Sequence, residues 1–367
     1  MTSTLPLRRA SDHLRPLRIA FVAPSRYPIK EPYAGGLEAF CGTMVRALRE
    51  QGHQVDMYAA VGSQGHQLDI QLPGVDWGDA PENAVDTEYP AGEREKEDCA
   101  FIALRNHLVD QDYDVVHNNS LNAWMFPSAQ SQEHLPMVTT LHTPQLPEMQ
   151  EAITNAGRAS GAFAAVSHTT GADWITPTPV EVVPNGVNVR QWALGPGGKS
   201  AVWFGRLVPE KGAHLAIDAC RERQLPLILA GRKGDHAYFK EEIAPRLKYP
   251  EVRWIGELPH DKLRQLVGNC ALTVVTPRWE EPFGLVAFES MACGTPVAAF
   301  ARGGLAELLA EAPACLAASD SVPALADAID RARTFDRRKV RNWVVARHSL
   351  TQTAQRYIQL YREVMVR

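Results

Sequence analysis

Two glutamates stand eight positions apart in the segment Glu281-Pro-Phe-Gly-Leu-Val-Ala-Phe-Glu289, and carboxylate pairs are the residues that act on glycosidic bonds. Pro282 suits a first helical turn and Gly294 ends a helix, so the sequence predicts a helix over residues 283–293. Eight helical residues at about 1.5 Å each separate the two carboxylates by roughly 12 Å along the axis. An acid and a base acting on one glycosidic bond must lie within about 5–9.5 Å, so we expect a clamp on both ends of an extended ligand instead.

The backbone between the two glutamates offers hydrogen-bond donors. The first amides of the predicted helix can point at phosphate or sugar oxygens because they have no acceptor within the helix; they belong to Phe283, Gly284, Leu285 and Val286. Hydroxyl-binding carboxylates at each end, with bare amides between them, fit a ligand made of a sugar, a diphosphate and a ribose. The alternative for Glu289 is a half-buried helix carboxylate that a neighbouring side chain satisfies.

A second segment with chemistry is Gly205-Arg-Leu-Val-Pro-Glu-Lys-Gly212, which lies between a predicted strand and a predicted helix over residues 214–220. A strand-to-helix turn at the carboxyl edge of a sheet binds anions, because free helix amides and the helix dipole favour negative charge. Arg206 and Lys211 add two cations that can straddle a diphosphate. Taken alone, the same two residues also suit an ordinary charged surface.

Two smaller signals lie in the first half of the chain. Gly35 and Gly36 follow the first predicted strand and let the backbone approach a ligand, although the dinucleotide fingerprint G-x-G-x-x-G is absent there. His142 lies just after one predicted strand and His117 ends another, so both are expected to face the cleft at the carboxyl edge of a sheet. A histidine that caps a turn is the alternative for each, and above all for His117.

Short apolar runs alternate with helix-patterned stretches along the chain, which predicts βαβ units and parallel sheets. The predicted strands cover residues 18–24, 53–60, 113–117, 136–141, 161–166, 200–204, 226–230, 252–255, 271–275 and 296–300. Gly52 ends a helix that begins near Leu37, and the last residues have apolar side chains at helical spacing. The fold class is therefore α/β, with two Rossmann-like, doubly wound domains that bind ligands between the carboxyl ends of their sheets.

The most turn-rich stretch, residues 184–199, marks the boundary between the two domains. We expect a first domain over residues 1–187, joined by a terminal amphipathic helix over 351–367, and a second domain over 188–350. The acidic stretch 69–98 is predicted to be a solvated insertion or a lid over an acceptor.

The composition excludes several function classes. A formal net charge of -4 and a pI near 6.3 give no attraction to nucleic acid. The six cysteines show neither a C-x-x-C pair nor metal-ligand spacing, so no metal site is predicted and a reducing cytoplasm fits best. No signal peptide or membrane span is visible. Basic residues near the start suit a solvated tail or a peripheral membrane contact; they are Arg8, Arg9, Arg15 and Arg18.

With these segments in view, the sequence resembles the family-4 glycosyltransferases, which are retaining enzymes of the GT-B fold. The resemblance covers nearly the whole chain and depends most on the glutamate–seven–glutamate element at 281–289, with Met291-Ala-Cys-Gly-Thr-Pro296 behind it. Residues 205–212 and 183–187 match the family as well. The resemblance implies that the first domain holds the acceptor, that the second binds the nucleotide sugar across a deep cleft, and that the terminal helix crosses back to the first domain.

The resemblance also implies roles for the matching residues. Arg206 and Lys211 would bind the diphosphate and stabilise the leaving group in place of a metal. Glu281 would contact hydroxyls of the transferred sugar, and Glu289 the ribose. The implied catalytic set is His142, Arg206, Lys211 and Glu281. The implied donor-binding set is Gly35, Gly36, Gly205, Ile255, Glu257, Leu258, Phe283, Gly284, Leu285, Val286 and Glu289.

The expected function is transfer of a hexose-type sugar from a UDP- or GDP-sugar to an unidentified hydroxyl acceptor, with retention and with neither metal nor cofactor. No residue suits the nucleophile of a double displacement, so Glu281 is expected to position the sugar while positive charge stabilises the departing diphosphate. The rival interpretations are a nucleotide-sugar epimerase, a phosphorylase and a non-catalytic nucleotide-binding module. A dehydrogenase is weaker, because the glycine fingerprint is absent. The base, the acceptor and the oligomeric state stay open.

Overall fold

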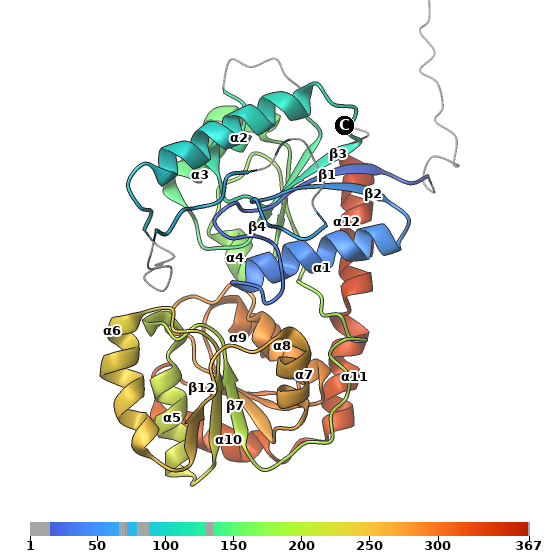
Figure 1. Ribbon diagram of the computed structural model, residues 1–367. Helices are drawn as coiled ribbons and strands as arrows, with labels where there is room; N and C mark the ends of the chain where they lie inside the picture. Colours follow the sequence, from blue (N-terminus) through green and yellow to red (C-terminus); the bar gives the residue numbers. More distant parts are fainter. Residues whose placement is uncertain (1–14, 66–69, 71, 79–87, 129–134, 366–367) are drawn as a thin grey trace, which may run out of the picture.

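The computed structural model describes residues 15–65, 70, 72–78, 88–128 and 135–365, which form two lobes, each built on one parallel sheet (Figure 1). The first sheet has the order β2-β1-β3-β4-β5-β6 and the second has the order β12-β11-β10-β7-β8-β9. In each sheet the order reverses beside the first strand, between β1 and β3 and between β7 and β10. Open α/β sheets bind ligands at the carboxyl ends of the strands that flank such a reversal.

The strands are short and mostly apolar, and helices cover both faces of each sheet. The strands of the first sheet are β1 (Arg18–Val22), β2 (Gln54–Tyr58), β3 (Val115–Asn118), β4 (Met137–Leu141), β5 (Ala162–Ala165) and β6 (Val180–Val182). Those of the second are β7 (Ala201–Phe204), β8 (Leu227–Ala230), β9 (Val252–Trp254), β10 (Leu272–Val275), β11 (Val297–Phe300) and β12 (Cys315–Ala317). All ten predicted strands are present, with ends shifted by at most two residues. The sequence analysis missed β6 and β12, which are three residues long.

The helices follow the strands in a regular alternation. The first lobe contains α1 (Gly36–Glu50), α2 (Glu93–Val109), α3 (Pro147–Ala156) and α4 (His168–Ala172), with short 3-10 turns at Ala123–Met125 and Gly157–Ser160. The second contains α5 (Ala213–Glu222), α6 (His236–Tyr238), α7 (His260–Gly268), α8 (Leu285–Ala292), α9 (Gly303–Leu309), α10 (Val322–Ala332) and α11 (Arg337–Arg347). A 3-10 turn precedes α5 at Pro209–Lys211, and the segments Phe239–Ile243 and Ala244–Lys248 continue α6.

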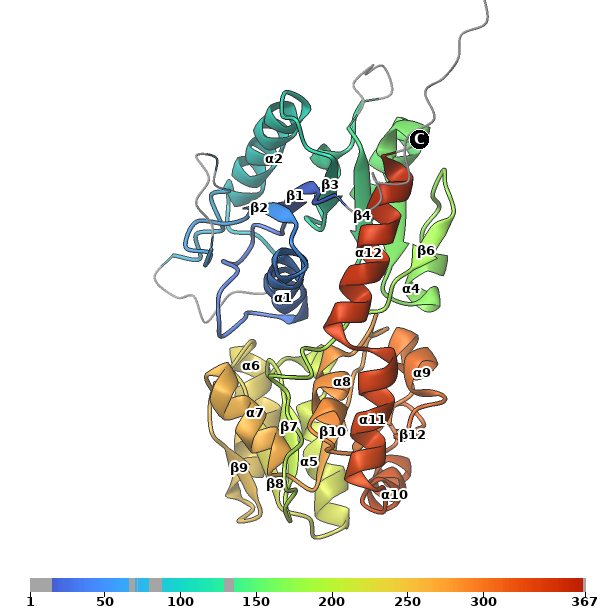
Figure 2. The same cartoon turned by 90° about the vertical axis from the view of Figure 1, so that its right-hand side faces the viewer.

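The terminal helix α12 (Leu350–Val364) crosses back to the first lobe, as predicted (Figure 2). Its buried face packs into the same core as α1 and the inner strands of the first sheet, through Tyr357 and Tyr361. The crossing occurs where Val187 forms a parallel bridge with Ser349, so the two connections between the lobes lie side by side.

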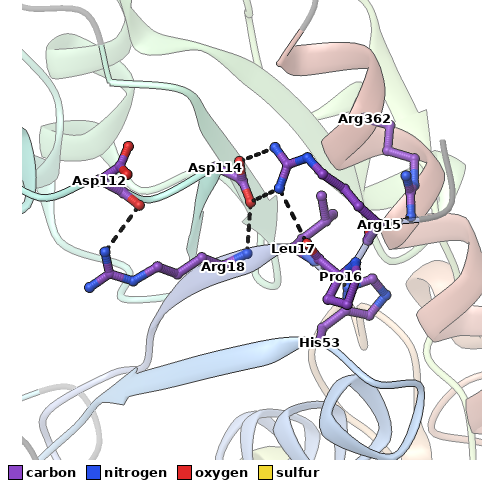
Figure 3. A network of polar contacts seen from close by, with 8 residues as sticks. All are labelled: Arg15, Pro16, Leu17, Arg18, His53, Asp112, Asp114 and Arg362. Atoms are coloured by element: carbon purple, nitrogen blue, oxygen red, sulfur yellow. Dashed lines mark hydrogen bonds and ion pairs between the residues drawn. The ribbon is translucent and has the colours of Figure 1, made fainter. Parts of the chain in front are cut away.

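The basic residues near the start of the described chain are held at the amino edge of the first sheet (Figure 3). The Arg15 guanidinium donates to the carboxylate of Asp114 at 2.8 Å, and the same carboxylate accepts the backbone N–H of Arg18. Arg362 of α12 donates to the carbonyl of Arg15, which ties both ends of the described chain together. Arg8 and Arg9 lie outside the described residues.

The acidic stretch at 69–98 is partly built into the first lobe. The buried carboxylate of Glu97 in α2 accepts hydrogen bonds from Ser25 Oγ at 2.5 Å and from Tyr89 Oη at 2.8 Å. The described part of the acidic stretch therefore packs on the loop after β1 instead of forming a purely solvated insertion. Residues 69, 71 and 79–87 lie outside the described chain. Over the part of the chain that the structure covers, no helix combines the length and the apolar character needed to cross a bilayer.

Candidate active site

The residues singled out in the sequence gather at the carboxyl ends of strands from both sheets. In the second lobe, the loop that contains Arg206 follows β7 and the loop that contains Glu281 follows β10, on either side of the strand-order reversal. In the first lobe, His142 directly follows β4, and α1 begins with Gly36. Parallel strands end at one edge of their sheet, so four separate segments meet where the two lobes face each other.

Lys211 and Glu281 form an ion pair at the centre of this region. Lys211 Nζ lies 2.6 Å from Glu281 Oε2, and Trp279 Nε1 donates to the same oxygen at 3.0 Å. The ammonium group also lies 4.8 Å from the centroid of the Trp279 ring, a cation–π contact. The structure thus brings together a cation predicted to bind phosphate and a carboxylate predicted to bind sugar hydroxyls. The sequence analysis missed Trp279, although it stands two positions before Glu281.

Local backbone geometry holds Lys211 in place. Gly212 adopts a left-handed conformation with φ +62°, and a Cβ there would lie 2.4 Å from the carbonyl oxygen of Thr276. Only glycine therefore lets this turn pack against the end of β10. The Thr276 hydroxyl donates to the carbonyl of Lys211 at 2.9 Å and accepts from Trp203 Nε1 at 3.1 Å. The backbone of Lys211 is consequently fixed at the end of the sheet, and its side chain is held by the ion pair with Glu281.

The helix after Glu281 begins later than predicted. Helix α8 starts at Leu285, because Gly284 precedes it in a left-handed conformation with φ +79°. Pro282 lies in an extended loop, where its carbonyl accepts from Ser167 Oγ of the first lobe at 2.8 Å. The prediction of a helix from residue 283 was therefore wrong. The predicted distance of roughly 12 Å between the Glu281 and Glu289 carboxylates assumed that both lie in one helix, and Glu281 does not.

The later helix start also changes which of the four backbone amides predicted to bind the ligand, those of residues 283–286, lie in a first helical turn. Phe283 and Gly284 precede the helix, and the Phe283 ring is buried against Phe288 with centroids 4.5 Å apart. Leu285 and Val286 do stand in the first turn of α8, where amides have no acceptor within the helix. Of the four residues predicted to offer free amides, only Leu285 and Val286 lie in the first turn of a helix.

Glu289 lies in a different environment from Glu281. It lines a hollow between the lobes, together with His260 and Arg264 of α7 and with Tyr33 and Thr43 of the first lobe. The Tyr33 and His260 rings meet edge to face across this hollow, with centroids 5.1 Å apart. Burial raises the pKa of the Glu289 carboxyl to about 8, although the nearby Arg264 guanidinium opposes the shift. Burial therefore favours the protonated form of this carboxyl in the ligand-free protein.

Replacing Glu289 with glutamine should stabilise the protein at alkaline pH. The pKa is 4.5 for an ordinary glutamate and about 8 for folded Glu289, so the unfolded wild type binds fewer protons between these values. Its free energy of unfolding must then fall as the pH rises through this window. The variant lacks this loss, so urea unfolding at pH 5 and 9 should show its advantage growing by on the order of 1–2 kcal/mol, after allowance for partial exposure. The exposed Glu257→Gln is the control; an equal pH-dependent gain there would contradict the assignment.

Arg206 lies half-buried on the loop that joins β7 to Lys211. The N–H of Gly205 donates to Ala230 at 3.0 Å, and the N–H of Leu207 donates to the carbonyl of Arg232 at 3.0 Å, so the loop stays paired with the chain after β8. Burial lowers the pKa of Arg206, and the neighbouring Arg232 lowers it further. A second arginine beside the predicted diphosphate site was not found from the sequence.

His142 is oriented by Asn119, which follows β3. The Asn119 amide nitrogen donates to the carbonyl of His117 at 3.3 Å, so its oxygen faces His142 Nε2 at 2.9 Å. Nε2 must then donate, which leaves Nδ1 as an acceptor for a hydroxyl. Burial lowers the pKa of His142 to about 3, so the ring is neutral at physiological pH. The sequence analysis did not identify Asn119.

His117 is a core residue and does not face the space between the lobes. It lies within β3, is fully buried, and contacts Tyr361 of α12 through Nδ1 at 2.7 Å and Thr140 through Nε2 at 2.8 Å. Both predictions for His117, a cleft-facing side chain and a turn cap, were therefore wrong. Its partner Tyr361 lies far along the chain, so local patterning carries no trace of this contact.

The remaining predicted residues lie at two separate edges. A Cβ added to Gly36 would meet no protein atom within 4 Å, whereas one on Gly35 would lie 2.9 Å from Glu38 Oε2. Space beside Gly36 is thus available to a ligand. Ile255, Glu257 and Leu258 follow β9, and Gly256 between them has φ +74° and accepts from the Gly231 N–H at 2.7 Å. This hydrogen bond joins the loop after β9 to the loop after β8 at the carboxyl edge of the second sheet.

Two family models match consecutive parts of the chain. The model described as "Glycosyltransferase Family 4" matches residues 34–191, and the model described as "Glycosyl transferases group 1" matches residues 188–343. The D-inositol 3-phosphate glycosyltransferase of Kribbella flavida is 27% identical, over 79% of this chain and 81% of that protein. A glycogen synthase of Mycobacterium tuberculosis is 29% identical over 47% of this chain and 48% of that protein.

Solved structures share the two-lobed fold. Sucrose-phosphate synthase from Thermosynechococcus elongatus aligns with a TM-score of 0.76 at 21% identity and covers 95% of this chain and 99% of that one. Anabaena Alr3699/HepE in complex with UDP-glucose aligns with a TM-score of 0.68 at 19% identity and covers 95% of this chain and 100% of that one. At these identities the likeness shows the fold alone.

Proposed function

The chain belongs to the family-4 glycosyltransferases, and from this premise we propose that it moves a hexose-type sugar from a UDP- or GDP-sugar to a hydroxyl acceptor, with retention and without a metal. The chain is a glycosyltransferase of the GT-B fold. The donor, the stereochemistry and the metal independence are the proposed parts. The observation that carries them is the 2.6 Å pair of Lys211 and Glu281, which spans the β7–β10 reversal and includes a lysine on the same loop as Arg206.

This arrangement suits a nucleotide-diphosphate sugar, because it offers hydroxyl acceptors and fixed positive charge in one place. Glu281 would accept hydroxyls of the sugar, while Lys211 and Arg206 would bind the diphosphate. The neutral Nδ1 of His142 would accept one more sugar hydroxyl from the first lobe. The complex of the Anabaena protein with UDP-glucose supports a nucleotide sugar as the donor class.

Retention is the stereochemistry that the family resemblance implies. Glu281 is engaged by Lys211 and Trp279, so it suits positioning of the sugar and not nucleophilic attack. The bond from the anomeric carbon to the diphosphate would break, and the acceptor oxygen would bond to the same face of the sugar. The acceptor proton would pass to the departing phosphate oxygen. Lys211 and Arg206 would stabilise the charge that develops on that oxygen, which is the largest catalytic contribution that such a site can make.

Thermal unfolding with UDP-, GDP- and ADP-sugars tests the donor. A donor at a hundredfold excess over its Kd should raise the free energy of unfolding by about 2.7 kcal/mol. The shift should persist in EDTA, and the anomeric configuration of the product should be that of the donor sugar. If no nucleotide sugar shifts the melting temperature, the proposed function is wrong. Conversion of the donor without an acceptor would instead indicate an epimerase, and a requirement for inorganic phosphate would indicate a phosphorylase. Binding without any conversion would indicate a non-catalytic nucleotide-binding module.

A further inference from the structure

Arg206 and Arg232 lie side by side at the carboxyl edge of the second sheet. Phe204 pairs with Ala230 in the ladder of β7 and β8, and Leu207 bridges Lys233 with the same offset, which aligns Arg206 with Arg232. The glycines that precede them permit the close approach, since a Cβ on Gly231 would lie 1.8 Å from the carbonyl oxygen of Gly205. The two arginine side chains therefore extend from neighbouring backbone positions on adjacent segments.

Both arginines face the first lobe. The Arg232 guanidinium lies 5.7 Å from the centroid of the Tyr27 ring, which belongs to the loop after β1. Glu38, in the first turn of α1, is buried and interacts electrostatically with Arg206, Arg232 and Arg26. One buried carboxylate thus interacts electrostatically with three arginines where the lobes meet.

We propose that Arg232 is a further donor-binding residue, which forms with Arg206 a two-arginine site for the diphosphate of the nucleotide sugar. This inference rests on the proposed function. Two planar guanidinium groups present parallel N–H donors, which is the geometry that phosphate oxygens bind best. Two like charges held together in a half-buried place repel each other, and the negative charge of a diphosphate relieves that repulsion. Lys211, which is paired with Glu281, then binds the diphosphate at its sugar-proximal oxygen, where the bond to the sugar breaks.

Glu38 has a defined part in this arrangement. It belongs to the helix that begins at Gly36, and burial raises the pKa of its carboxyl while the three arginines oppose that shift and so favour the carboxylate when no donor is bound. A diphosphate bound by both arginines would lie near this carboxylate and be repelled by it. Removing the charge of Glu38 should therefore strengthen diphosphate binding, while removing the charge of Arg232 should weaken it.

Isothermal titration with UDP, inorganic pyrophosphate and uridine tests the inference. Arg232→Gln should weaken UDP and pyrophosphate at least tenfold and leave uridine within twofold, as Arg206→Gln should. The matched control is Lys233→Gln, one residue further on, whose amine lies over the Phe239 and Trp254 rings at 4.2 and 5.1 Å. That variant should bind UDP within twofold of wild type. Glu38→Gln should bind UDP at least threefold more tightly.

The outcomes separate this inference from the function on which it rests. If wild type binds UDP and Arg206→Gln loses it, but Arg232→Gln behaves like Lys233→Gln, the two-arginine site is overturned and the proposed function stands. If wild type binds none of UDP, GDP and ADP, the proposed function itself fails. Should Arg232→Gln not fold, Glu38→Gln decides: unchanged or weaker UDP binding overturns the inference.

Discussion

Replacing Lys211 with alanine is expected to lower kcat by about 10²- to 10³-fold while KM for the donor changes by less than about fivefold. The side chain is held by its pair with Glu281, and the backbone carbonyl accepts from the Thr276 hydroxyl, which in turn accepts from Trp203 Nε1. The charge is therefore positioned before the donor arrives. A prepositioned charge stabilises the developing negative charge more than the ground state. Steady-state kinetics, with UDP affinity measured separately, checks the split between kcat and KM.

Two controls keep the Lys211 result interpretable. Lys233→Ala removes a lysine that packs on aromatic rings and should leave kcat within about twofold. The double variant Lys211→Ala/Glu281→Gln shows whether the half-buried carboxylate, left without its cation, is itself the cause of any loss of stability. A raised KM with unchanged kcat would contradict the prediction, since it would mean that Lys211 contributes binding energy equally to substrate and transition state.

Replacing Tyr361 with alanine is expected to lower the free energy of unfolding by about 3–5 kcal/mol. The side chain is fully buried in the core of the first lobe, and its hydroxyl contacts His117 Nδ1 at 2.7 Å. Truncation would leave a large cavity beneath α12 and a buried imidazole nitrogen without its partner. Urea unfolding, followed by fluorescence and by circular dichroism, measures the loss.

Tyr361→Phe separates packing from hydrogen bonding. It keeps the ring and removes the hydroxyl, so it should cost only about 1–3 kcal/mol. A loss as large as that of the alanine variant would show that the polar contact dominates. A loss below about 1 kcal/mol for the alanine variant would contradict the view that α12 is part of the first core.

The strand pattern of this protein was readable from its sequence. Runs such as 19–23 and 297–300 are apolar throughout because strands of a parallel sheet are buried on both faces, and that pattern is local. Three residues are too few for periodicity to identify a strand: β6 and β12 escaped notice, while the equally short β9 was found within the predicted run 252–255. The turn at Gly284 escaped for a different reason. Pro282 and the apolar residues after it suit a helix start, whereas a left-handed glycine packed against Leu305 of α9 delays it.

The predicted residues with chemistry came from local motifs, but their partners did not. Lys211 and Glu281 stand in separate segments, and each alone suits a surface charge; the meeting of β7 and β10 places them 2.6 Å apart. His117 and His142 look alike in sequence, since each stands at the end of an apolar run. Helix α12, from the far end of the chain, buries His117 against Tyr361. His142 instead forms a hydrogen bond with Asn119.

The sequence by itself determined the fold class, the order of strands and helices, and the segments that carry charge, because burial and turn formation depend on residues close together in the chain. Tertiary structure alone decided that Glu281 is paired, that Glu289 lies in a hollow between the lobes where burial raises its pKa, and that Arg232 stands beside Arg206. These outcomes depend on desolvation and on Coulomb interactions between segments far apart in the chain. Both quantities exist only after the two sheets have formed and the lobes face each other.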